Sequence, residues 1–182
     1  MTRDETIAIL GVLKTAYPNF YRNMDRDSAL QAISLWSDMF KDDQAELVSA
    51  AVKALIATRT EGWPPNIGEV KAKMQTLQNP GELAEGEAWA LVEKATRNGI
   101  YGYKEEFDAL PPVVQKAVGS ANQLREWAIL GSDELKTVVA SNFMRSYKTI
   151  QKREKETAMI PADVRNLLSA VADRLSLPGG AP

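Results

Sequence analysis

Acidic side chains are the residues in this sequence that lie close enough together to suggest chemistry. A pair of carboxylates can act as general acid and base, or can hold a magnesium ion. These acids fall where helices are expected to begin, and a negative charge there is favoured by the helix dipole. We therefore expect capping and solvation rather than catalysis. The clusters are Asp42-Asp43, Glu85 with Glu87, Glu105-Glu106-Asp108, and Asp133-Glu134.

The residue types that many enzymes use are missing. The chain has neither cysteine nor histidine, which excludes thiolate nucleophiles, disulfides, sulfur-ligated zinc and the commonest general base. It contains no G-x-x-x-x-G-K-[ST] loop for nucleotide phosphates and no G-x-S-x-G elbow. We therefore expect a protein that is not an enzyme and that uses no cofactor or metal.

Composition indicates an ordinary folded protein. Its 182 residues, 45% hydrophobic and 25% charged, suffice for one large domain or two small ones. The net charge of −2 argues against a generally basic nucleic-acid coat protein. The N-terminus does not resemble a signal peptide, and no apolar stretch approaches the roughly 18 residues of a membrane span. These features predict a cytoplasmic protein.

Apolar residues recur at helical spacing along the chain, and no alternating strand pattern persists, so the predicted fold is all-α. Capping boxes are expected at Thr2-x-x-Glu5, Asp43-x-x-Glu46 and Asn66-x-x-Glu69. The cluster Gln78-Asn79-Pro80-Gly81 is the predicted domain boundary.

Four regions follow from these signals. Residues 1–78 are predicted to form a compact four-helix domain, and residues 82–156 a second helical region. That second region ends in a long helix that opens at Gly131-Ser132. Residues 160–176 are predicted to form an amphipathic helix, and residues 177–182 a loose tail.

The amphipathic helix is the main candidate for binding a partner. Its apolar residues follow the i, i+3, i+4, i+7, i+11 spacing of one helix face. Such a face either packs on the chain's own core or fills a groove on a partner. The peripheral position and the polar segment before it leave both open. The face consists of Val164, Leu167, Leu168, Val171 and Leu175.

A basic stripe precedes that helix. Arg145, Lys148 and Lys152 share one side of the predicted long helix, with Arg153 beside them. Such a stripe can track nucleic-acid phosphates. It can also be a solvated helix end, where cations are favoured by the dipole. The second interpretation is preferred, because acidic residues interrupt the run and no aromatic platform surrounds it.

The four tryptophans divide into two groups. Trp36, Trp89 and Trp127 lie on apolar helix faces and are expected in the core. Trp63 precedes two prolines in a turn. It either plugs the core from the loop or presents an aromatic ring to a partner, and the plug is preferred.

Three features along residues 5–74 resemble the replicative-helicase loader/inhibitor proteins of phages that infect Gram-positive bacteria. They are YPNF at residues 17–20 after the first helix, the helix of Trp36, and WPPNIGE at residues 63–69. Residues 143–168 also look like the tail half of longer phage members. This sequence departs from the family in that residues 80–182 look structured throughout.

The resemblance implies a loader without its own ATPase, working in the cytoplasm of the host bacterium. Such proteins bind the hexameric replicative helicase, hold it inactive, and deliver it to an origin through an origin-bound initiator. The family has a compact helical N-terminal domain, and its C-terminal part is implicated in gripping the helicase. The family carries no catalytic residue.

Two other functions fit parts of the sequence. A DNA-binding replication or transcription factor would use the basic stripe and would bind DNA with steep salt dependence. A phage scaffolding or head-assembly protein would also be helical and acidic, and would self-associate through long, weakly packed helices. The short predicted helices, with tryptophans at core spacing, argue against the scaffold.

Overall fold

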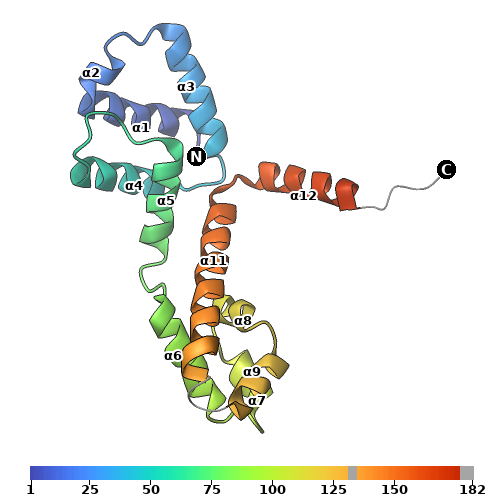
Figure 1. The fold of residues 1–182 in the computed structure, drawn as a ribbon. Coiled ribbons are helices and arrows are strands. Elements are labelled where there is room, and N and C mark those ends of the chain that lie inside the picture. The colour runs from blue at the N-terminus through green and yellow to red at the C-terminus, as the bar shows by residue number, and fades with distance from the viewer. Residues whose placement is uncertain (131–134, 177–182) are drawn as a thin grey trace, which may run out of the picture. The chain divides into compact units, whose positions relative to one another are not determined.

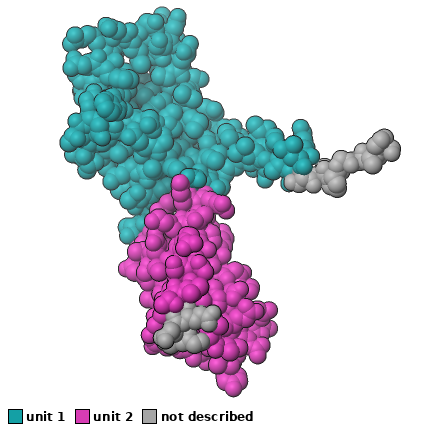
Figure 2. All heavy atoms as spheres, in the orientation of Figure 1, with its two compact units in different colours: residues 1–80, 156–182 teal, residues 81–155 magenta. Residues whose placement is uncertain are grey.

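The computed structural model describes residues 1–130 and 135–176. The protein is helical over 77% of its length, with no strand in the described residues, which confirms the all-α prediction. The chain divides into two compact units, which are teal and magenta in Figure 2. Unit 1 comprises residues 1–80 and 156–182, and unit 2 comprises residues 81–155. Within the described ranges, no helix is both long and apolar enough to cross a membrane.

Unit 1 is built from five helices near the N-terminus and a segment from the end of the chain (Figure 1). The expected capping boxes at Thr2 and Asn66 both form, so two orphan amides at each helix start are satisfied. The helices are α1 (Arg3–Ala16), α2 (Pro18–Tyr21), α3 (Arg26–Met39), α4 (Ala45–Thr58), α5 (Ile67–Gln78), the last turn of α11 (Ala140–Met159), and α12 (Ala162–Ser176).

The predicted capping box at Asp43 is wrong. Helix α4 begins at Ala45 with Gln44 at its N-cap, and the Asp43 carboxylate instead lies 2.5 Å from the ammonium of Lys71. Lys71 is only 6% exposed, and a buried cation without a counter-charge is costly. The need to pair Lys71 therefore outweighs the gain from a local cap.

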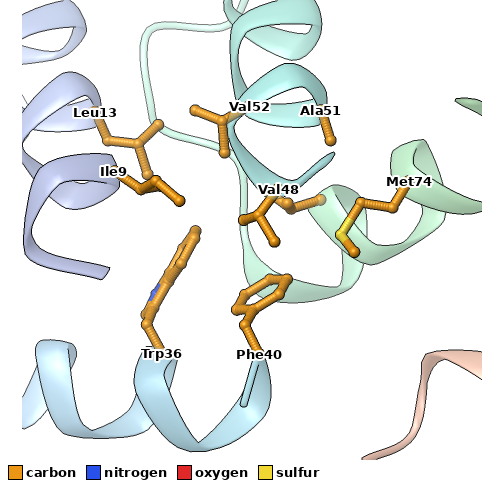
Figure 3. Close-up of a cluster of buried hydrophobic side chains, with 9 residues drawn as sticks. Ile9, Leu13, Trp36, Phe40, Val48, Ala51, Val52 and Met74 are labelled. Atoms are coloured by element: carbon orange, nitrogen blue, oxygen red, sulfur yellow. The ribbon is translucent and has the colours of Figure 1, made fainter. Parts of the chain in front are cut away.

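The core of unit 1 forms where α1, α3, α4 and α5 meet (Figure 3). Phe40 is fully buried there, and its ring lies 5.2 Å from the ring of Trp36, so Trp36 occupies the core as predicted. The other buried residues are Ile9, Leu13, Val48, Ala51, Val52, Val70 and Met74.

Unit 2 contains α6 (Glu85–Thr96), α7 (Tyr103–Asp108), α8 (Pro112–Val118), α9 (Ala121–Ile129), the π-helical turn η1 (Leu135–Val139), and α11 as far as residue 155. Helix α7 begins at Tyr103, with Gly102 at its N-cap. The expected start of the long helix at Gly131-Ser132 lies outside the described residues, as does the Asp133-Glu134 cluster.

An aromatic cluster forms the centre of unit 2. The Trp89 and Trp127 rings lie 5.5 and 6.4 Å from the ring of Phe143, and the Tyr147 ring stacks on Phe143 at 5.9 Å. The Tyr147 hydroxyl donates to the carbonyl oxygen of Leu83 at 3.0 Å. Burial raises the pKa of Tyr147. Trp89 and Trp127 are only partly buried and pack against the core, whose buried aromatic members are Phe143 and Tyr147.

Truncation of Phe40 tests the core of unit 1. We expect Phe40→Ala to lower the free energy of unfolding of unit 1 by about 3–5 kcal/mol, because a fully buried ring leaves a cavity. Phe20→Ala is the matched control, since Phe20 is 58% exposed, and should cost less than about 1 kcal/mol. Native-state hydrogen exchange of α4 amides measures both. Equal losses from the two variants would contradict the assigned core.

Candidate partner-binding site

The apolar face of α12 is open to solvent. We call it the α12 stripe, and its members are 37% exposed at Val164, 44–64% exposed at the three middle positions, and 81% exposed at Leu175. None of residues 162–175 is buried, and the helix extends away from the helices of residues 1–80 (Figure 1). In the described residues, this face therefore does not pack into a core of its own chain, which was one of the two alternatives that the sequence left open. The stripe consists of Val164, Leu167, Leu168, Val171 and Leu175.

The first turn of α12 is nevertheless held by the turn between α3 and α4. The Asp42 carboxylate accepts a hydrogen bond from the Ala162 amide at 3.0 Å, and the Lys41 ammonium lies 2.6 Å from the Asp163 carboxylate. Pro161 is buried beside these contacts. The first turn of α12 is thus fixed to the α3–α4 turn, while Leu167, Leu168, Val171 and Leu175 further along the helix are exposed.

Charge reinforces this attachment. The hydrogen bond from Lys41 lowers the pKa of the Asp163 carboxyl from its ordinary value of 3.8. The same contact raises the pKa of Lys41. Both groups therefore stay ionised near neutral pH, and a carboxylate in the first turn of a helix is also favoured by the helix dipole.

An apolar groove opens where α12 begins. It has a volume of about 640 Å³ and lies between α3, the start of α5 and the α11–α12 connection. We call it the α3/α12 groove. Val164 lines it, so the groove is continuous with the α12 stripe. Its other apolar lining residues are Leu35, Met39, Ile67, Met159 and Ile160.

The α3–α4 turn that holds α12 is itself well anchored. The amino group of Met1 donates to the carbonyl oxygens of Lys41 and Asp43 at 2.9 and 2.8 Å. The Lys71 ammonium that pairs with Asp43 also lies 4.8 Å from the centre of the Phe40 ring. The α3–α4 turn, which holds the first turn of α12, therefore contacts the residue before α1, helix α5 and the core.

The preferred interpretation, in which Trp63 plugs the core, is wrong, because the Trp63 side chain is 59% exposed. Pro65 is the buried residue of this turn. The turn is closed by Arg59, whose guanidinium lies 2.5 Å from Glu69 and 3.4 Å from Glu61. The contact with Arg59 lowers the pKa of Glu69. A rigid turn therefore presents Trp63 to solvent, at a place separate from the residues that line the α3/α12 groove.

The basic stripe lies on α11, and acids of unit 2 pair with part of it. The Lys148 ammonium lies 3.1 Å from Glu85, and Lys152 also has an interaction partner. Lys155 lies 2.5 Å from Glu82. Arg145 and Arg153 lie on the same helix. These pairs support the solvated helix end, since neutralised cations attract phosphate weakly.

Several members of the acidic clusters make structural contacts in the described part of the chain. Asp42 caps α12, Glu85 pairs with Lys148, and Glu87 accepts a hydrogen bond from the Ala84 amide. Glu106 accepts from the Asn98 side chain. Among the described residues, no group of three or more acidic side chains is placed to hold a metal ion.

The sequence did not predict the contact between the α3–α4 turn and α12, nor the α3/α12 groove. Lys41 and Asp42 meet a helix about 120 positions further along the chain, and no local pattern encodes such a contact. One signal was available, because Leu35 stands next to Trp36 and so points away from the buried face of α3. An apolar residue in that register is typical of a second contact surface, and Leu35 is 56% exposed.

Comparison with known proteins identifies the N-terminal part of the chain. Residues 1–71 match the family model for the N-terminal domain of the helicase loader/inhibitor of phage SPP1. The match covers α1 to α4 and the first turn of α5, which confirms the resemblance of the N-terminal residues. The resemblance of residues 143–168 stays a prediction. No curated protein and no solved structure matches the chain.

Acid should weaken the attachment of α12. Because the pKa of Asp163 is lowered when it contacts Lys41, this contribution is present above the ordinary pKa of 3.8 and is lost as pH falls through the lowered value. We expect the carboxyl carbon of Asp163 to titrate below the ordinary value in NMR spectra. Lys41→Gln should move the midpoint upward, whereas Lys53→Gln should not. An unchanged midpoint in Lys41→Gln would contradict the contact.

Proposed function

We propose that this protein binds a hexameric replicative helicase through the α12 stripe, restrains it, and loads it at an origin of replication. The observation that carries the proposal is the match of residues 1–71 to the N-terminal domain of a phage helicase loader/inhibitor. The exposed apolar helix joined to that domain supports it. The proposal places the protein in the cytoplasm of the host bacterium, where an origin-bound initiator would be a second partner.

The α12 stripe suits a helix-in-groove interaction. Burying a leucine or valine side chain contributes about 1.5–3 kcal/mol, and the stripe offers five such side chains. Association must offset the freedom that both partners lose. The attachment of the first turn through Asp42 and Lys41 reduces that cost, because the helix is already formed and oriented.

The protein would act without chemistry of its own. It has no histidine, no cysteine and no phosphate-binding loop of the P-loop type. A loader of this kind changes the helicase only by binding one ring state more tightly than another. We therefore infer that the protein is not an enzyme and that its effect on the helicase is set by differential affinity.

Two double variants test the helicase contact. Leu168→Asp with Val171→Asp places charges on the α12 stripe and should weaken helicase binding at least tenfold. Asn166→Asp with Ser169→Asp adds the same two charges on the opposite, polar side of α12 and should leave binding nearly unchanged. All four positions are exposed, so circular dichroism should show both variants folded. Light scattering with phage and host helicases, with and without nucleotide, measures binding.

The result has three clear outcomes. Loss of binding in the stripe variant alone supports the proposal. Equal binding by both variants would move the contact away from α12. Failure of the unmodified protein to bind either helicase would remove the proposal, and steep salt-dependent DNA binding would then favour the basic stripe of α11.

A further inference from the structure

We propose that α12 also pairs with α12 of a second copy of this chain, as an antiparallel, two-fold symmetric dimer. Each Leu175 would enter the α3/α12 groove of the other copy. The exposed α12 stripe is then covered by a second α12, as the register of the stripe, the position of the groove and the charges of α12 indicate.

The stripe is complementary to itself when two copies run antiparallel. With the two-fold axis between residues 169 and 170, Val164 lies opposite Leu175 of the second copy, and Leu168 lies opposite Val171. Every stripe position then faces an apolar position, as the packing of two helices requires. Because the register is symmetric, each contact occurs twice.

In this register, the α3/α12 groove lies opposite Leu175 of the second copy. Val164 lines the α3/α12 groove, and Leu175 of the second copy lies opposite Val164. Leu175 is the most exposed member of the stripe, at 81%, and within its own copy it is at the other end of the helix from the groove. Leu35 and Met39 of α3 would surround the inserted side chain. The second copy therefore supplies its Leu175 to the groove of the first copy, and its own groove receives Leu175 of the first copy.

Charge on one flank of α12 matches the same arrangement. Asp163 and Arg174 lie on the same side of the stripe, about 20° apart around the helix axis. In the antiparallel register, Arg174 of the second copy comes within about 3 Å along the axis of the level of Asp163. The Asp163 side chain remains 57% exposed beside Lys41, and a carboxylate accepts several donors at once. Two symmetric ion pairs result.

The other flank presents no repulsion. It carries Arg165, and the two copies of Arg165 would lie about 13 Å apart along the axis, which exceeds the Debye length at physiological salt. The charges on both flanks are therefore compatible with the antiparallel dimer.

The size of the interface predicts a weak dimer. A helix of fifteen residues is about 22 Å long, and two such helices with two filled grooves bury on the order of 1,000 Å². That area is at the lower end of specific interfaces, so we expect a dissociation constant in the micromolar range or above. The two-fold symmetry closes the assembly at two copies. This distinguishes it from the open-ended assembly of a scaffold.

The dimer does not depend on the proposed function, since it is tested without a helicase. If a helicase binds the same stripe, dimer and helicase exclude each other, and the dimer holds the stripe covered until the helicase displaces the second copy.

Sedimentation equilibrium of the full chain from about 1 to 500 µM tests the dimer. The unmodified protein should pass from monomer to dimer and no further. Leu168→Asp with Val171→Asp should remain monomeric over the whole range, and Asn166→Asp with Ser169→Asp should behave as the unmodified protein. A monomer at every concentration would overturn the proposal, as would larger assemblies or undiminished dimerisation of the stripe variant.

A charge exchange tests the antiparallel register. Arg174→Asp places two acids together at each end, and Asp163→Arg places two arginines there, so each variant alone should dimerise at least tenfold more weakly. An equimolar mixture should form a heterodimer with both ion pairs restored. Arg165→Asp is the matched control and should dimerise normally. Undiminished dimerisation of Arg174→Asp, or no recovery in the mixture, would overturn this register.

Discussion

The ion pair between Lys71 and Asp43 is the constraint on which much of unit 1 depends. Lys71 is buried against the Phe40 ring, so its charge requires a partner inside the protein. Asp43 supplies it and is thereby withdrawn from capping α4. The pair fixes the α3–α4 turn against α5, and the turn then offers Lys41 and Asp42 to the first turn of α12.

That arrangement explains how a helix can be both attached and exposed. In the described residues, α12 contacts the α3–α4 turn through Lys41 and Asp42 at its first turn, where Val164 also lines the α3/α12 groove. The other four residues of its apolar face are 44–81% exposed. Polar contacts at a helix end set direction without burying the stripe. An exposed face of this kind marks an interaction surface, and its attachment reduces the conformational freedom lost on binding.

The two units differ in how their cores are made. In unit 1, aliphatic side chains from four helices surround Trp36 and Phe40. In unit 2, four aromatic rings form a connected cluster, and the Tyr147 hydroxyl is satisfied by a backbone carbonyl. The family match ends within α5, so it concerns unit 1 alone. The α12 helix that we propose as the contact belongs to unit 1 but lies outside the matched residues.

The helical class, the capping boxes at Thr2 and Asn66, the burial of Trp36 and the apolar face of α12 could be predicted from the sequence alone. Each follows from local spacing, because helical periodicity and capping act over a few residues. Only the tertiary structure decided the role of Asp43, the exposure of Trp63 and the attachment of α12. These depend on contacts between residues far apart in the chain. Lys41 reaches Asp163, and the burial of Lys71 changes which bond Asp43 makes.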